Sequence, residues 1–408
     1  MTTALCFMLL AALGPAVAGP LPPGGAAPAD GTAPDTTLVH VQALFRHGAR
    51  TPTNPYPSDP YYNNTYMPYG LGHLTKHGRQ MEYELGQYLR ERYVGGPDGA
   101  APSSGTALLA EEYSTGAVLV NTSAVERTQE SVAAFFAGLW PPGESQAWST
   151  DGSRLGHLWV PIPYHIIPAD EDRAIAGTAL CPSRDLETLR VYKDPALLKA
   201  AVDALGGTET FEYTKKHAGI TDQQIAVLQL AALYSALACQ EDLNMTLPEW
   251  PRPVYPEPLR TVYHLFLTTY SYNLQLRQQN FGDLTTGILS AARQPEAHPK
   301  LLVYSAHDST ITAAITIFQL EPQDAAGMGI PEFSACLLFE LHRDASGALG
   351  LQFFYRREAG GPLVRMIPKG CGPFCPLGVL QSILEDAGEL PIGRYKCDVP
   401  LTTEIKID

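Results

Sequence analysis

The sequence predicts an α/β protein built as a three-layer sandwich, in which helices cover both faces of a mostly parallel central sheet, with an inserted α-helical cap domain. Strand-like and helical segments alternate near both ends of the chain, whereas the middle is almost entirely helical in pattern. The chain has 36 Gly and 35 Pro among 408 residues, which indicates many loops and excludes a helical bundle or coiled coil.

Two strand and helix pairs open the predicted sheet. Residues 37–45 (TLVHVQALF) alternate β-branched and apolar side chains, as a buried strand does. Residues 74–93 then place apolar side chains at four-residue steps, which is typical of a helix. Residues 117–121 form a second short strand, and we expect the helix over residues 125–139 to end at the Trp140-Pro141-Pro142 run.

Helical spacing dominates the middle of the chain before strands return. It covers residues 186–237 and 259–289, which a Pro-rich stretch at 248–258 separates. Later segments again alternate strand and helix patterns. We expect strands at 301–305, 336–341 and 351–355 and a helix at 309–318.

This order divides the chain into a sheet domain interrupted by a cap. We assign residues 37–170 and 271–408 to the α/β catalytic domain and residues 171–270 to the helical cap domain. Residues 1–18 have the pattern of a secretory signal peptide, with a short apolar core and small residues at Ala16-Val17-Ala18. The Pro/Gly/Ala-rich residues 19–36 read as a flexible linker.

Cysteines and glycosylation motifs agree with export. Removal of the signal leaves an even number of cysteines, which suggests three disulfides in an oxidising compartment but leaves their pairing open. Cys371 and Cys375 could form a local bridge or half of a zinc site, and the bridge is favoured because no second pair has metal-ligand spacing. The remaining cysteines are Cys181, Cys239, Cys336 and Cys397, and the glycosylation motifs begin at Asn63, Asn121 and Asn244.

The overall charge restricts the class of partner. The formal net charge of -14 argues against nucleic acid or an anionic membrane, since both reward a basic surface. No segment after the signal has 18 uncharged apolar residues, so we expect a soluble mature protein without a membrane anchor.

Charged side chains follow three of the predicted strands, at the edge where ligands bind in such sheets. Three arginines could converge there in an acidic chain, and this arrangement costs self-repulsion unless it meets an anion. A guanidinium group engages two oxygens of a tetrahedral oxyanion at once, so the sequence predicts a phosphate pocket. The residues concerned are Arg46, His47 and Arg50, then Arg127, then His307 and Asp308.

These residue types suggest phosphoryl transfer. The three arginines and His307 would neutralise the charge on the phosphoryl oxygens. His47 is the candidate nucleophile, because neighbouring positive charge keeps its imidazole unprotonated for attack. Asp308 is the candidate acid that protonates the leaving oxygen and later the base that activates water.

Each motif alone also has an ordinary structural reading. A lone RHG tripeptide would mean little, Arg127 alone suits a solvated helix start, and a His-Asp pair is often a helix cap. The functional interpretation depends on all three at predicted strand ends. His73 and His77 lie four residues apart and could bind a metal, but no third ligand suggests itself.

The same motifs resemble the histidine acid phosphatases of the prostatic, lysosomal and testicular type. The similarity starts at residues 38–52, where an apolar strand leads into RHGxRxP, and continues in the ELG-containing helix of residues 72–93. It reappears in Glu126-Arg127-Thr128, in SAHDST at residues 305–310 and around Cys371 and Cys375.

The resemblance implies a histidine phosphatase fold with no metal or other cofactor and with the site residues named above. It also implies disulfides Cys181–Cys397, Cys239–Cys336 and Cys371–Cys375, and a homodimer. Two residues depart from the family pattern, since Ala49 and Glu126 stand where relatives carry Asp. Neither change removes a catalytic group.

We therefore interpret the chain as a secreted acid phosphatase that hydrolyses orthophosphoric monoesters, including phosphoproteins, with the lysosomal lumen as the alternative location. A phytase or a lysophosphatidic acid phosphatase of the same superfamily is the first alternative. A secreted protein that binds a phosphorylated ligand without turnover is a second, but it would be expected to lack the nucleophile or the acid.

Overall fold

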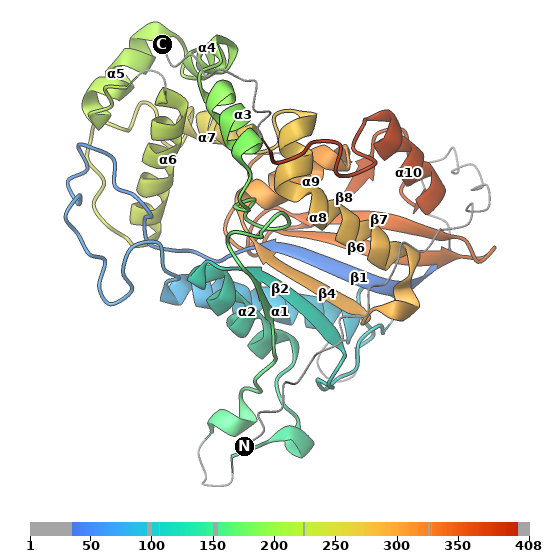
Figure 1. Cartoon of the computed structure of the whole chain (residues 1–408). Coiled ribbons are helices and arrows are strands. Elements are labelled where there is room, and N and C mark those ends of the chain that lie inside the picture. Colours follow the sequence, from blue (N-terminus) through green and yellow to red (C-terminus); the bar gives the residue numbers. More distant parts are fainter. Residues whose placement is uncertain are drawn as a thin grey trace, which may run out of the picture.

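The computed structural model describes residues 35–95, 100–105, 107–149, 154–222, 225–324, 327 and 329–398. The predicted signal peptide, and the linker up to residue 34, lie outside these residues. Helices cover both faces of one sheet, and a further group of helices extends beyond one end of it (Figure 1). The three-layer α/β architecture predicted from the alternating pattern is therefore confirmed.

Within the described residues the sheet has nine strands, and because only its first half is parallel it is a mixed sheet and not the mostly parallel one that the pattern predicted. The strand order is β3-β2-β4-β1-β6-β7-β8-β5, with β9 paired to β7. Strands β3, β2, β4 and β1 run parallel to one another, whereas every pairing from β1 and β6 onward is antiparallel. The bounds are β1 Thr36–Arg46, β2 Val118–Ser123, β3 His165–Ile167, β4 Leu301–Ala306, β5 Leu320–Pro322, β6 Cys336–Asp344, β7 Leu349–Arg356, β8 Leu363–Pro368 and β9 Cys375–Pro376.

The antiparallel half follows from short connections. A tight turn containing Gly347, which has a φ of 90°, joins β6 to β7, and such a short link can only make a hairpin. Four strands escaped the sequence prediction: β3, β5, β8 and β9. Three of these have two or three residues, too few for an alternating pattern to emerge.

Helices α1 and α2 cover one face of the sheet, and α8, α9 and α10 cover the other (Figure 1). The helix predicted over residues 74–93 begins at Lys76, because the hydroxyl of Thr75 caps it by accepting from the backbone N–H of Gly78. The bounds are α1 Lys76–Tyr93, α2 Glu126–Leu139, α8 Leu274–Arg293, α9 Asp308–Ile317 and α10 Leu377–Asp386.

Glycines allow α1 and α2 to touch backbone to backbone. A Cβ on Gly86 would come within 1.9 Å of the carbonyl oxygen of Phe135, and one on Gly138 within 2.0 Å of that of Tyr83. Any other residue at either position would push the helices apart. This contact explains the glycine of the ELG motif, and it holds α2, which carries Arg127, against the sheet.

The predicted helical block forms its own hydrophobic cluster beyond the sheet. Leu230, Leu237 and Val262 are fully buried in it, and Tyr56 from the loop after β1 packs among them. The division of the chain at residues 170 and 270 stays a prediction. The bounds are α3 Pro182–Tyr192, α4 Pro195–Ala204, α5 Thr208–Ala218, α6 Ala226–Asp242 and α7 Leu259–Thr269.

Two of the three implied disulfides are present. Cys181 is bonded to Cys397 and Cys371 to Cys375, which also identifies the latter pair as a local bridge. The Cys239–Cys336 pairing is wrong, because both cysteines are free, buried thiols. Cys239 lies in α6, where its sulfur accepts from Arg50, whereas Cys336 opens β6 and packs into the core under α1 and α2.

The glycosylation motifs differ in accessibility. Asn63 and Asn244 are exposed outside the helices and strands, as an acceptor must be. Asn121 is half-buried in β2, which is hydrogen-bonded to β3 on one side and β4 on the other. Among the described residues, no helix is both long and apolar enough to cross a membrane.

Candidate active site

Three neighbouring parallel strands bring the predicted residues to one edge of the sheet. β2, β4 and β1 lie side by side, with Arg46 opposite Ala306 and Thr122 opposite Ser305 in the register. The segments that follow these strands therefore leave the sheet together. Of the six residues singled out from the sequence, Arg46 is the last residue of β1, and the other five come from these segments or from the first turn of the helix that follows.

His47 lies at the centre of this group and is 2% exposed. Its Nδ1 is 2.8 Å from the carbonyl oxygen of Gly48, and because a carbonyl can only accept, Nδ1 carries the proton. Nε2 of the neutral ring is therefore left with a free lone pair. The turn requires glycine at position 48, since a Cβ there would come within 2.2 Å of the carbonyl oxygen of Gly78.

The surroundings keep His47 neutral. Burial is the main reason that its pKa lies well below the ordinary value, and the positive charges of Arg127 and Arg46 lower the pKa further. A neutral imidazole with an unprotonated Nε2 is the form that can attack phosphorus. His307 lies beside it, with the two ring centroids 5.6 Å apart and the planes at 71°.

His307 is also held as a neutral ring. It precedes α9, and its Nε2 is 3.1 Å from the hydroxyl oxygen of Ser123 at the end of β2. Burial is the largest cause that lowers its pKa to about 3, followed by the charge of Arg127. The Ser123 contact fixes the ring across the junction of β2 and β4.

Arg46 and Asp308 form a buried ion pair, with Nη2 2.8 Å from Oδ2. The hydroxyl of Tyr263, on α7, donates to the same carboxylate oxygen over 2.7 Å. Burial alone would raise the pKa of Asp308, but Arg46 and the Tyr263 hydrogen bond outweigh it and lower the pKa. The guanidinium of Arg46 also lies over the ring of Phe333, 4.3 Å from its centroid.

Arg50 and Arg127 complete the cluster without a carboxylate of their own. Arg50 donates from Nη2 to the hydroxyl of Ser235 over 2.9 Å and from Nη1 to the sulfur of Cys239 over 3.3 Å. Arg127 donates to the carbonyl oxygen of Gly72 over 3.4 Å. Burial, and next the charge of Arg50, lower the pKa of Arg127 to about 10.

The cluster therefore carries more positive charge than the protein neutralises. Three guanidinium groups share one carboxylate, and the Nε of each is buried with no partner among the described residues. Unpaired buried charge is costly, and a bound anion would offset that cost. The arrangement suits a doubly charged oxyanion placed next to Nε2 of His47.

The sequence also suggested His73 and His77 as metal ligands. His73 pairs with Glu126 at 3.1 Å and His77 with Asp242 at 2.6 Å. Among the described residues no group of three or more His, Cys, Asp or Glu side chains could hold a metal ion. These histidines instead make polar contacts with α2 and α6.

Sequence reasoning missed the residues that the cap supplies. Tyr263, Ser235 and Cys239 come from α6 and α7 and contact Asp308 or Arg50. Nothing in a helical pattern marks such side chains, because their partners are far away in the sequence. Ser123 could have been found, since it ends a parallel strand as Arg46 does.

The sequence matches known families over most of its length. The model of the histidine phosphatase superfamily (branch 2) matches residues 37–205 and 274–368. Human lysosomal acid phosphatase is 30% identical over 350 residues, covering 84% of this chain and 76% of the relative. Rat prostatic acid phosphatase is 29% identical over 365 residues, covering 85% of this chain and 86% of the relative.

Solved structures agree on the fold. The apo phytase of Hafnia alvei superposes with a TM-score of 0.61 and 16% identity, covering 90% of this chain and all of that one. The Klebsiella sp. ASR1 phytase gives a TM-score of 0.59 and 19% identity, with the same coverage. The chain therefore belongs to branch 2 of the histidine phosphatase superfamily, whose members hydrolyse phosphoric monoesters through a phosphohistidine.

Proposed function

We propose that this protein is an acid phosphatase in which His47 is the nucleophile and Asp308 the proton donor. The observation that carries this proposal is the excess of buried guanidinium charge around an unprotonated Nε2. Arg46, Arg50 and Arg127 hold the phosphoryl oxygens, and His307 supplies a further polar contact. Nε2 attacks phosphorus in line, the ester bond breaks, and the leaving oxygen takes a proton.

Because the pKa of Asp308 is lowered, the proton that the leaving oxygen takes has to enter the site with the substrate. In the free site the carboxyl is ionised at mildly acidic pH, so it cannot donate a proton of its own. A phosphomonoester has a second pKa of about 6, and its monoanion can bring the proton with it. The bound phosphoryl group neutralises the arginines that lower the pKa of Asp308, so this carboxyl can hold the proton and pass it on. The reaction should therefore slow as pH rises above about 6.

The second half of the reaction reverses these roles. After the alcohol leaves, Asp308 is ionised and can take a proton from water. The water oxygen attacks phosphorus, the bond to Nε2 breaks, and inorganic phosphate is released with His47 neutral again. The three arginines remain in place throughout, because each is held by protein groups as well as by the phosphoryl oxygens.

A monoester fits this site better than a polyphosphate. Glu332 lines the hollow next to Arg46, and two other arginines, Arg260 and Arg357, both lie within 4 Å of this carboxylate. They leave little free positive charge for the further phosphates of phytate. The hollow next to Arg46, lined by Tyr234, Tyr263 and Phe333, has a volume of only about 20 Å³ and leaves no room for a second phosphate group.

Export to an oxidising compartment is part of the proposal. The disulfides Cys181–Cys397 and Cys371–Cys375 and the exposed Asn63 support a secreted or lysosomal glycoprotein. The curated relatives carry lysosomal and prostatic names, in line with either location.

A homodimer is supported by β3, an edge strand whose Ile166 is 48% exposed.

The test is to trap the phosphoenzyme. The protein would be mixed rapidly with ³²P-labelled p-nitrophenyl phosphate and quenched in alkali, in which phosphohistidine survives. We expect label on the wild type and none on His47→Ala, with His165→Ala, an exposed histidine on β3, as the matched control. Label on His47→Ala, or turnover close to that of the wild type, would refute the assignment.

A further inference from the structure

A second cluster of charged residues lies at the opposite end of β1. It borders a cavity of about 610 Å³ on the sheet face covered by α1, near Thr36, where β1 begins. Since a strand rises about 3.3 Å per residue, Thr36 lies roughly 30 Å from Arg46. A cavity of this size can hold a small molecule, and nothing in the proposed reaction uses it.

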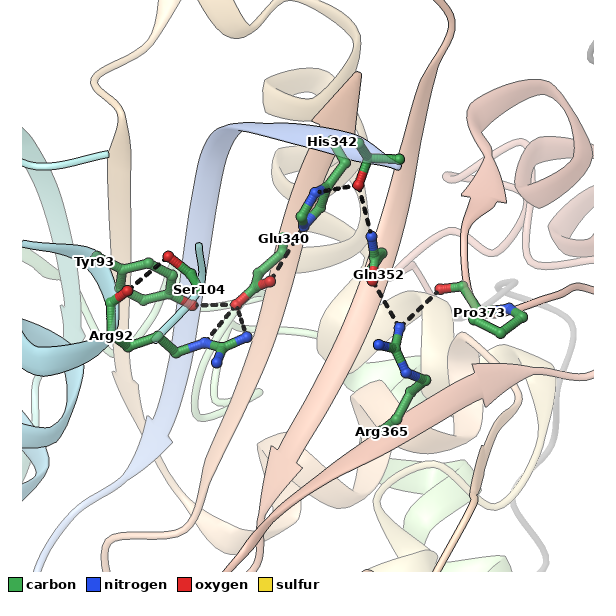
Figure 2. A network of polar contacts seen from close by, with 9 residues as sticks. Arg92, Tyr93, Ser104, Glu340, His342, Gln352, Arg365 and Pro373 are labelled. Atoms are coloured by element: carbon green, nitrogen blue, oxygen red, sulfur yellow. Dashed lines mark hydrogen bonds and ion pairs between the residues drawn. The ribbon is translucent and has the colours of Figure 1, made fainter. Parts of the chain in front are cut away.

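One side of the cavity is a complete ion pair. Glu340 is 1% exposed, and its Oε1 accepts from Nε and Nη2 of Arg92 and from the hydroxyl of Tyr93, each over 2.7 Å. Its Oε2 lies 3.2 Å from Nε2 of His342 (Figure 2). Both oxygens of the carboxylate are therefore engaged, and its charge is balanced by Arg92.

A chain of hydrogen bonds leads from this pair to Arg365. His342 Nδ1 lies 2.9 Å from Oγ1 of Thr36, and the amide nitrogen of Gln352 donates to the same Oγ1 over 3.2 Å. This contact turns the amide oxygen of Gln352 toward Arg365, whose Nη1 donates to it over 2.7 Å (Figure 2). The orientation of every side chain along this path is thus fixed.

Arg365, in contrast, forms no ion pair with any described residue. Its protein contacts are two neutral oxygens, those of Gln352 and, at 3.5 Å, Pro373. No carboxylate lies within 4.0 Å of it among the described residues, and its Nε and Nη2 have no hydrogen-bond partner there. Burial is the main cause that lowers its pKa, while the charge of Glu340 opposes this shift and that of Arg92 adds to it. The cation is thus partly desolvated, and no described carboxylate is in contact with it.

The free nitrogens of two guanidinium groups border the same space. Arg92 also keeps one nitrogen, Nη1, outside the ion pair. Each guanidinium carbon lies 4.8 Å from the ring centroid of Phe354, so the two carbons are at most twice that distance apart. Paired guanidinium groups recognise phosphate and carboxylate oxygens in many proteins.

We propose that this cavity binds a small oxyanion between Arg365 and Arg92. The oxyanion is either inorganic phosphate, which the enzyme's own reaction releases, or a larger organic anion with a phosphate or carboxylate group. Two carboxylates line the cavity, but Arg92 already balances Glu340, and Asp35 is exposed to water, which screens its charge. Residues 103–105 form a rim of the cavity, with Ser103 exposed.

The location is tested by soaking crystals in selenate, a tetrahedral dianion with an anomalous signal. We expect one peak between Arg92 and Arg365 and a separate peak beside His47. In Arg365→Met the first peak should vanish and the second remain. An empty cavity in wild-type crystals at saturating selenate would overturn the proposal, whereas a missing peak at His47 would count only against the proposed function.

The affinity is tested by equilibrium dialysis, with ³²P-phosphate and citrate as separate probes. We expect Arg365→Met to weaken binding of one probe at least tenfold and to leave kcat unchanged. Arg343→Met, an exposed arginine on β6, is the matched control. If Arg365→Met fails to fold, two substitutions of opposite charge at the exposed Ser103 test the site instead. Ser103→Glu should then weaken binding, and Ser103→Lys should strengthen it, by roughly three- to tenfold each. Affinities that none of these changes alters would overturn the site.

Discussion

Arginines cluster at both ends of β1, but the two clusters differ in how much of the guanidinium charge is balanced by carboxylates. At the Arg46 end, three guanidinium groups share one carboxylate, and two neighbouring histidines are kept neutral. At the Thr36 end, Arg92 and Glu340 cancel, whereas Arg365 has no carboxylate within 4.0 Å among the described residues. The number of charges is thus a poor guide to function. Charge that the protein leaves unbalanced is the better one, because a buried unpaired ion is retained at a cost.

The largest expected effect is a loss of kcat at the Arg46 end of β1, caused by removing the proton donor while the arginines that bind phosphate stay in place. Asp308→Asn should lower kcat for alkyl phosphates by about 10² to 10⁴, the usual contribution of a general acid. The loss for p-nitrophenyl phosphate should be less than about tenfold, because that leaving group needs little protonation. Steady-state kinetics on the two ester classes measure the difference. Equal losses would remove Asp308 as the acid.

Removing the carboxylate charge at the Thr36 end of β1 should lower the stability of the fold and leave turnover nearly unchanged. Glu340→Gln leaves Arg92 buried without its counter-charge, so the free energy of unfolding should fall by about 3 kcal/mol. Turnover per folded molecule should stay within about twofold. Glu111→Gln, at an exposed ion pair of 3.8 Å, is the control and should cost less than about 1 kcal/mol. Urea denaturation measures both, and equal costs would contradict this view of the Thr36 end.

Stability should fall as the pH falls from about 6.5 to 4. In the folded protein the pKa of His307 is about 3 and that of His40 is about 4. On unfolding, both pKa values return to the ordinary value of 6.5. In that window the unfolded chain binds more protons, so each such histidine costs about 1.4 kcal/mol per pH unit. Unfolding midpoints between pH 4 and 7 measure the slope. His307→Asn should reduce this slope by about 1.4 kcal/mol per pH unit, which corresponds to one proton. An unchanged slope would mean that His307 is protonated in the folded protein.

The smallest expected effect concerns the contact between the cap and the acid. Tyr263→Phe removes a hydrogen bond that favours ionised Asp308, so the pKa of this carboxyl should rise. A bond worth about 1 kcal/mol corresponds to a roughly fivefold fall in kcat/KM, and the acid limb of its pH profile should move to higher pH. Tyr213→Phe, which removes a cap hydroxyl bonded to Trp250, is the control. A fall in kcat/KM without a shift of the limb would leave Tyr263 with a packing role alone.

Local patterns were sufficient where the answer depends on neighbours in sequence. The strand over residues 37–45 and the helix over residues 74–93 were predictable, because alternation and four-residue spacing report burial of one face. The convergence of Arg46, Arg127 and His307 was predictable from one rule about the carboxyl ends of parallel strands. The strands β3, β5 and β9 were not, since two or three residues are too few to show a period.

The sequence by itself determined which chemical groups are available and which segments end at the same edge of the sheet, because both depend on residue type and local periodicity. Only the tertiary structure decided which charges are balanced. It paired Glu340 with Arg92 across 248 residues and placed the free thiol of Cys239 on Arg50. In the part of the chain that the structure describes, it also left Arg365 without a carboxylate within 4.0 Å. Such contacts join residues far apart in the chain, and the distances between them are set by the packing of whole elements.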